Sequence, residues 1–282
     1  MIFAAPETIG FDEIAFHAHW DTIGLVAALG LAYAMGIRRL SSIHAPAGEP
    51  AVTRRRVAWF AGGLVLFLGA RSWPLHDIGD QSLFTFHMIE HLLLALAVPP
   101  MLLRGTPPWL LRLAVTPILP VLRLLTRPLV ALLLFNGTLA LLHAPEVVAL
   151  QLNNEAAHLG LHLALLTTAT LMWWPVVGPL PELPRLTPFM AMGYLFLQSL
   201  VPTIPASFLT FASAPVYDAY ADLPRLWGLS VLDDQLIAGL IMKIGGGLLL
   251  WSIIATIWFR WAAAEERASR RGPVVSRPPD RG

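Results

Sequence analysis

Two pairs of histidines in this chain have a spacing that suits metal binding. His87 and His91 are four residues apart, and so are His158 and His162. On an α-helix this spacing places two imidazoles one turn apart on the same face. If the two helices are neighbours, four rings meet at one place, and imidazole is a ligand for copper, zinc, iron and nickel. Either pair alone is more typical of histidines that hydrogen-bond between helices.

Two charged residues lie in the apolar stretches around these histidines. Glu90 sits between His87 and His91, and Lys243 lies well inside the last apolar stretch. Ionisable groups inside a bilayer are costly and usually face a partner or a cavity. We therefore expect Glu90 and Lys243 to pair directly, or to contact a hydrated cavity beneath the metal site. A buried ion pair that only fixes helix packing is the alternative.

Three more residues are secondary candidates for the site. His143 ends an apolar stretch that lies between the two pairs in the sequence, and His76 shortly precedes the first pair. Asp234 opens the last apolar stretch, where a carboxylate at a helix N-terminus is stabilised by the helix dipole. Capping is therefore the default role of Asp234, and metal binding or an intramembrane polar contact is the alternative.

The composition is that of a membrane protein. Of 282 residues, 56% are hydrophobic and 13% are charged, whereas about one quarter of the residues in soluble domains are charged. Cysteine is absent, so the sequence excludes disulfides and thiolate ligands, and a metal must use His, Met, Asp or Glu. The arginines gather in a few short segments. Anchoring at the membrane surface explains them, and we expect no nucleic-acid partner.

Seven apolar stretches are long enough to cross a bilayer, which takes about 20 residues for a core of about 30 Å. The sequence therefore predicts an all-α membrane protein with a bundle of about seven transmembrane helices in one domain over residues 1–260. Segment 105–128 is interrupted by prolines and is expected to lie at the interface. Residues 261–282 are expected to form a disordered basic cytoplasmic tail. The predicted spans lie near 21–40, 57–74, 81–103, 128–143, 155–177, 188–211 and 233–259.

The arginines also predict the orientation. With seven spans, one side holds nearly all of them and the other side holds only Arg71 and Arg225. Cytoplasmic loops retain Lys and Arg, so the N-terminus is expected outside and the C-terminus in the cytoplasm. Every histidine except His44 then falls at the outer surface or in the outer half of a span, which indicates one functional face.

Short motifs follow one another in a characteristic order along these stretches. They are Phe86-His87-Met88-Ile89-Glu90-His91, Pro99-Pro100, Gly105-Thr106-Pro107, His143-Ala144-Pro145, Asn154-Glu155-Ala156-Ala157-His158, Trp173-Trp174-Pro175, Pro215-Val216-Tyr217 and Asp234-Gln235-Leu236. In this order and spacing, the chain resembles the multi-spanning cytochrome c oxidase assembly proteins called CtaG over most of its length. A second protein type with the same family name has one anchor and a cysteine-bearing copper domain, and this chain does not resemble it.

The resemblance implies a non-enzymatic assembly factor in the bacterial inner (plasma) membrane. It implies that copper binds at His87, His91, His158 and His162, and that the partners are a heme-copper oxidase subunit and the lipid bilayer. Zinc or heme b are the alternative cofactors, and a homo-oligomer is left open. The rival functions are a b-type heme protein with one axial histidine from each pair, a metal transporter and, with little support, a retinal protein.

Overall fold

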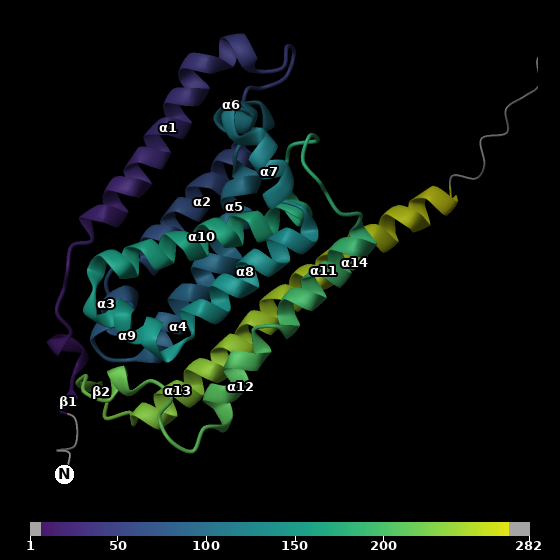
Figure 1. Cartoon of the computed structure of the whole chain (residues 1–282). Coiled ribbons are helices and arrows are strands. Elements are labelled where there is room, and N and C mark those ends of the chain that lie inside the picture. The colour runs from purple at the N-terminus through teal and green to yellow at the C-terminus, as the bar shows by residue number, and fades with distance from the viewer. Residues whose placement is uncertain (1–6, 271–282) are drawn as a thin grey trace, which may run out of the picture.

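The computed structural model describes residues 7–270, and most of these residues are helical (Figure 1). Lipid offers no hydrogen bonds, so a chain this apolar satisfies its backbone groups within helices. The helices are α1 (Trp20–His44), α2 (Arg54–Ala70), α3 (Leu75–Gln81), α4 (Phe84–Leu92), α5 (Val98–Gly105), α6 (Pro108–Val115), α7 (Leu119–Leu125), α8 (Pro128–Leu142), α9 (Pro145–Asn153), α10 (Glu155–Val177), α11 (Pro188–Leu200), α12 (Thr203–Phe211), α13 (Val231–Leu240) and α14 (Gly246–Arg270). The remaining elements are the strands β1 (Thr8–Ile9) and β2 (Arg225–Leu226), the 3₁₀ turns η1 (Phe11–Glu13), η3 (Thr116–Ile118) and η4 (Asp218–Tyr220), and the π-helical turns η2 (Leu93–Ala97) and η5 (Ile241–Gly245).

Six helical runs in the described part of the chain are long and apolar enough to cross a membrane. A seventh is obtained if α8 and α9, which meet at 71°, form one broken span. The prediction of a helical membrane protein with about seven spans is confirmed to this extent. The predicted orientation of the termini stays a prediction.

The set of candidate spans differs from the expected one at two places. Residues 108–125, expected at the interface, form a helical run of 18 residues that is apolar enough to span. Its prolines stand at the first positions of the short helices, where they remove no helical hydrogen bond, so the run is not broken. α2, expected as the span near 57–74, has 17 residues and is shorter than all six runs.

The bundle has two chemically different ends. α2 packs against α5, α10 contacts both α5 and α8, and α11 runs beside α14 (Figure 1). α3, α9 and the start of α13 gather at one end, which we call the histidine end because it carries His76, His87 and His158. The last turns of α1 lie beside α6 at the other end, the arginine end, which carries Arg55 and Arg104.

The span that contains α4 and α5 continues through two prolines. Pro99 and Pro100 lack the N–H groups that would bond to carbonyls one turn earlier. The wider turn η2 precedes them, and the indole N–H of Trp173 donates to the freed oxygen of Ala95 at 3.0 Å. Trp173 lies on α10 and is fully buried. A side chain of α10 therefore supplies the hydrogen bond that a carbonyl group of the proline-containing span lacks. This contact fixes the two histidine-bearing helices against each other.

Two details depart from the predicted fold. β1 and β2 form a short parallel pair, with Thr8 opposite Arg225, which ties the N-terminal segment to the chain before α13. Two-residue strands carry no periodic signal, so the sequence did not predict them. α14 also continues to Arg270, where Arg270 and Glu266 form an ion pair at 2.7 Å one turn apart. The prediction of a disordered tail from residue 261 is therefore wrong for residues 261–270, and residues 271–282 lie outside the described part.

Candidate metal centre

The two histidine pairs lie on neighbouring helices. α4 carries His87 and His91, and α10 carries His158 and His162. α3 crosses close to α4 at this level because Gly79 has no side chain, and a Cβ there would lie 2.9 Å from the backbone nitrogen of His87. All four histidines are buried. The spacing of each pair thus turns both of its rings toward the same helix interface.

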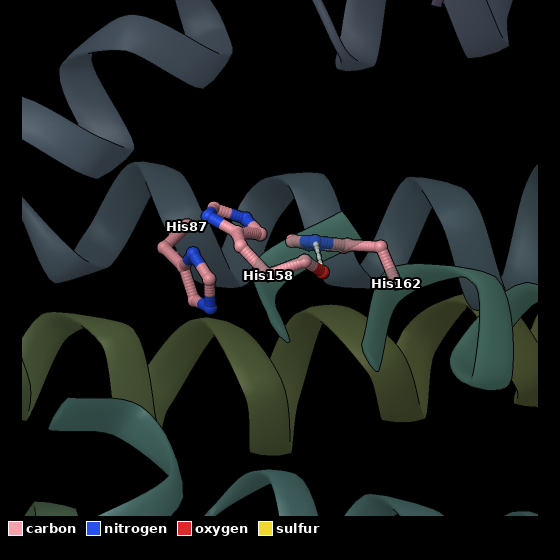
Figure 2. A group of neighbouring side chains, drawn as sticks. All are labelled: His87, His158 and His162. Atoms are coloured by element: carbon pink, nitrogen blue, oxygen red, sulfur yellow. Dashed lines mark hydrogen bonds between the residues drawn. The ribbon is translucent and has the colours of Figure 1, made fainter. Parts of the chain in front are cut away.

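The four rings converge on one small volume. Ring centres are 4.2 Å apart for His87 and His91, and 4.3 Å apart for His158 and His162. Across the interface, the distance is 4.8 Å between His91 and His162 and 5.9 Å between His87 and His158. Nitrogens of His87, His158 and His162 all lie within 4.8 Å of one another (Figure 2). The predicted convergence is present, and metal binding itself stays a prediction.

Hydrogen bonds determine which ring nitrogens are free for a metal. The Nδ1 of His162 lies 3.1 Å from the carbonyl oxygen of His158, along the dashed line in Figure 2. A carbonyl only accepts, so this contact favours a proton on Nδ1, whereas the Glu90 carboxylate 3.4 Å from Nε2 and the Arg71 N–H 3.4 Å from Nδ1 favour a proton on Nε2. The Nδ1 of His158 lies 3.5 Å from the carboxylate of Asp80, which orients that ring. The Nε2 of His158 and the Nδ1 atoms of His87 and His91 are buried and have no hydrogen-bond partner among residues 7–270.

These nitrogens fit a cation. Leaving a buried polar atom without a partner costs about 1–3 kcal/mol, and a metal ion would supply that partner. The Nε2 atoms of His91 and His162 are 3.0 Å apart, so one must carry a proton and the other a lone pair. On a tetrahedral ion with bonds of about 2.0 Å, two ligand nitrogens are about 3.3 Å apart. This one pair is thus close to the spacing of two ligands on one ion, whereas the nitrogens of His87, His158 and His162 are grouped only to within 4.8 Å and would have to move closer together.

A buried ion pair lies against the rings. The carboxylate of Glu90 is 3.1 Å from Nη1 of Arg71 and 2.8 Å from Nδ1 of His76. Nη1 of Arg71 also lies 3.4 Å from Nδ1 of His162, where it competes with the carbonyl of His158 for that nitrogen. Glu90 is fully buried and Arg71 nearly so. The pair therefore places one compensated negative charge beside the histidines.

The expected pair between Glu90 and Lys243 is wrong. Arg71, just after α2, reaches Glu90 because α2 packs against η2 and α5, which continue the helix that carries Glu90. Within residues 7–270, Lys243 forms no ion pair, and its Nζ lies 5.5 Å from the centre of the Phe211 ring. Lys243 is on the π-helical turn η5, which contacts α12. η5 also packs against α4, but the Glu90 carboxylate on α4 is taken up by Arg71 and His76 instead.

His76 and Asp80 on α3 extend the cluster. The carboxylate of Asp80 is 3.5 Å from Nε2 of His76 and 3.5 Å from Nδ1 of His158, so these three residues form a second group with metal-ligand spacing. Burial raises the pKa of the Asp80 carboxyl to about 6. Burial by itself disfavours a charged His76, but the carboxylate of Glu90 outweighs it, so the pKa of His76 is raised. His76, predicted as a secondary candidate, is thus held between two carboxylates.

A cavity of about 940 Å³ opens beside this second group, and we call it the vestibule. Its lining includes His17, His19, Asp77, Asp80 and His158. The two carboxylate oxygens of Asp77 lie 2.9 Å from Nδ1 of His17 and 3.1 Å from Nε2 of His19. The His19 ring is 4.6 Å from that of His76, which is 5.2 Å from that of His158. Imidazoles therefore follow one another from the exposed His17 to the buried cluster.

The vestibule is acidic. Asp21, Asp77, Asp80 and Glu155 line it, against one guanidinium from Arg71, which is a formal excess of three negative charges with neutral histidines. A concave surface lined by one sign of charge raises the local concentration of counter-ions. The vestibule is therefore suited to attract a metal cation.

Asp234 has a structural role. Its two carboxylate oxygens accept from the backbone N–H groups of Phe84 and Thr85, both at 2.9 Å, and one of them also accepts from Arg225 at 2.9 Å. Asp234 on α13 therefore caps the N-terminus of α4, one turn before His87. Capping was the default expectation, but the capped helix is a different one. Its bonds to two backbone N–H groups and to Arg225 are the buried polar contact that was the alternative expectation, and metal binding by Asp234 stays a prediction.

His143 lies beside the cluster, and within residues 7–270 its ring forms no hydrogen bond with the four rings. Its Nδ1 is 2.7 Å from the carbonyl oxygen of Leu139, and its Nε2 is buried without a hydrogen-bond partner. It lines an apolar cavity together with His91, Met88 and Met242. His143 thus offers one more free nitrogen on the far side of His91, and its role as a secondary ligand stays a prediction.

Sequence reasoning missed three acidic or basic residues that shape the site. Arg71 was counted only as one of two outer arginines, and Asp77 and Asp80 were not singled out. All three belong to the short stretch around α3, and each acts on a histidine or carboxylate from another element. Their position directly before the Phe86-His87 motif was the available signal. Their partners depend on tertiary packing, which spacing alone does not reveal.

Comparison with known proteins identifies the family of this chain. The profile of the cytochrome c oxidase caa3 assembly factors (Caa3_CtaG) matches residues 31–264. An uncharacterized protein of Mycobacterium leprae is 23% identical over 92% of this chain and 42% of its own length, and one of Mycobacterium bovis is 22% identical over 89% and 40%. The chain thus spans about two fifths of these relatives, and no solved structure matches it. By the family match, the chain belongs to the cytochrome c oxidase caa3 assembly factors.

Proposed function

We propose that this protein holds copper at the cluster of His87, His91, His158 and His162 and passes it to a heme-copper oxidase subunit during assembly. The observation that carries the proposal is the set of buried ring nitrogens without hydrogen-bond partners on two packed helices. The chain belongs to a family of cytochrome c oxidase assembly factors. No reaction is catalysed, since the chain only binds and releases its cargo.

Copper is preferred among the metals on chemical grounds. The cluster offers imidazoles and no thiolate, and this ligand set suits zinc, iron and nickel as well. Divalent first-row metals bind a given nitrogen site most tightly when the metal is copper. An oxidase with a heme-copper centre also requires copper at its catalytic subunit. Zinc is the alternative occupant, and metal analysis separates the two.

The vestibule supplies a route to the cluster in this proposal. A cation attracted by Asp77 and Asp80 meets His19 and His76 before it reaches His158, which belongs to both ligand groups. A shared ligand allows an ion to change partners without becoming fully unligated. We place the vestibule on the periplasmic side of the bacterial plasma membrane, in line with the arginine distribution.

One cross-helix pair, His91 and His162, is too close for the b-type heme alternative, whereas the ring centres of His87 and His158 are 5.9 Å apart and leave that alternative to a direct test. Iron between two axial imidazoles with bonds of about 2 Å separates their nitrogens by about 4 Å, and the porphyrin plane must fit between the rings. The Nε2 atoms of His91 and His162 are 3.0 Å apart and hydrogen-bonded. An absorbance spectrum after heme-replete expression tests this point, because a strong Soret band from the purified protein would favour heme.

The functional test uses cells that depend on this protein for oxidase assembly. The variant His87→Ala/His158→Ala should remain in the membrane and lower both the activity and the copper content of the oxidase. His44→Ala is the matched control, because His44 is exposed at the end of α1, away from the cluster. Normal oxidase copper in the double variant, at wild-type levels of the protein, would contradict the proposal.

A further inference from the structure

The arginine end contains a second polar site, which the copper proposal does not use. Arg55 and Arg56 at the start of α2, Arg104 on α5, Arg185 before α11 and Arg260 on α14 line one cavity of about 350 Å³. These residues come from four separate segments of the chain. Retention of arginines on one side of a membrane requires positive charge near the surface, but it does not require that five guanidinium groups face one cavity.

The arginines of this cavity lack acidic partners. None of the five forms an ion pair within residues 7–270, and no Asp or Glu lines the cavity. Nearby arginines do find partners: Arg112 bonds to Glu182 at 2.6 Å, and Arg270 bonds to Glu266 at 2.7 Å. The cavity therefore concentrates five positive charges that repel one another, and an anion would relieve this repulsion.

Close packing of the backbone holds the cavity together. A Cβ added to Gly105 would overlap the backbone nitrogen of Phe60, so α2 and α5 approach each other as only a glycine permits. The guanidinium of Arg104 lies 5.9 Å from the centre of the Trp59 ring, which supports its extended side chain. Arg56 donates to the carbonyl oxygen of Thr106 at 3.0 Å. At least two of the five groups are thus positioned before any ligand arrives.

We infer that this cavity binds an anion that carries phosphate groups. Guanidinium groups bind phosphate with two parallel hydrogen bonds, and several of them around one concavity match a phosphate with more than one free oxygen. Basic cavities between transmembrane helices are known sites for anionic headgroups. The shared chemistry is a phosphate, and its source is either the headgroup of an anionic phospholipid or soluble phosphate.

The test measures binding to the purified full chain in detergent. Cardiolipin, phosphatidylglycerol, the zwitterionic phosphatidylcholine and inorganic phosphate are titrated separately, with native mass spectrometry and thermal unfolding as readouts. The variant Arg104→Gln/Arg260→Gln removes two of the lining charges. Arg39→Gln/Arg123→Gln is the matched control, because these exposed arginines carry the same charge and do not line the cavity.

We expect the cavity variant to bind the anion about 30-fold more weakly than the wild type does, because each arginine near an anionic group raises the binding affinity about fivefold. The control variant should bind the anion as tightly as the wild type does. Preference for the anionic lipids over phosphatidylcholine identifies a headgroup site, and binding of inorganic phosphate alone identifies a soluble anion. Equal binding by both variants would overturn the inference, as would absence of binding by the wild type.

Discussion

The polar groups at the histidine end and at the arginine end of the bundle differ in the kind of interaction partner that they are missing. At the histidine end, buried ring nitrogens of His87, His91 and His158 have lone pairs or protons without partners. At the arginine end, the five arginines that line the cavity form no ion pair within residues 7–270. The first arrangement suits a cation and the second an anion. We therefore propose two sites in one bundle, and the opposite charge of their expected ligands follows from residue type and burial.

The two ends also differ in the free-energy cost of losing a partner. Charges at the histidine end are buried and mutually compensated, as with Glu90 and Arg71. Charges at the arginine end are largely exposed, as with Arg104 and Arg260. Removing one member of a buried pair leaves an uncompensated charge in a low dielectric, whereas an exposed arginine is stabilised by water and salt. Substitutions should therefore be far more destabilising at the histidine end.

The largest effect is expected at Asp234. Asp234→Ala removes the cap of α4 and leaves the buried Arg225 unpaired, so we expect the free energy of unfolding to fall by about 4 kcal/mol. The measurement is thermal or denaturant unfolding of the purified protein. Asp233→Ala is the control, since Asp233 is the exposed neighbour on the same helix. A loss at Asp234 no larger than that at Asp233 would remove the positioning role.

A smaller but substantial effect is expected at Glu90. Glu90→Gln leaves Arg71 buried without its counter-ion and should lower the free energy of unfolding by about 3 kcal/mol. Lys243→Met should lower it by less than about 1 kcal/mol, because Lys243 has no acidic partner among the described residues. Arg104→Gln at the exposed arginine end should change it by about 0.5 kcal/mol or less. Equal losses for Glu90→Gln and Lys243→Met would restore the pair that the sequence suggested.

The smallest effect is kinetic and lies in the vestibule. Asp77→Asn with His19→Ala weakens cation attraction at the surface without touching the buried cluster, so copper loading should slow by about tenfold. The final copper content should not change. Stopped-flow or timed metal analysis measures the rate, and Asp12→Asn, an exposed carboxylate before α1, is the control. A lower final copper content with an unchanged rate would place Asp77 in the binding site itself.

The sequence predicted the parts of the site that depend on local spacing. The shared face of His87 and His91, and of His158 and His162, follows from helical periodicity alone. Their meeting across α4 and α10 followed from the predicted depth of two spans. The partners of Glu90 were not predictable, because the segments that carry Arg71 and Lys243 both pack against its helix, and the choice of Arg71 depends on side-chain positions that spacing does not give. The capping of α4 by Asp234 joins residues 150 positions apart in the chain and gives no sequence signal either.

The copper content of the purified protein tests most directly whether the four histidines bind copper. Wild-type protein loaded with copper and freed of excess metal should retain about one ion per chain, bound through imidazole nitrogen. The variant in which His87, His91, His158 and His162 are all alanine should retain almost none, and His44→Ala should match the wild type. Equal copper in the wild type and the four-histidine variant would contradict the account.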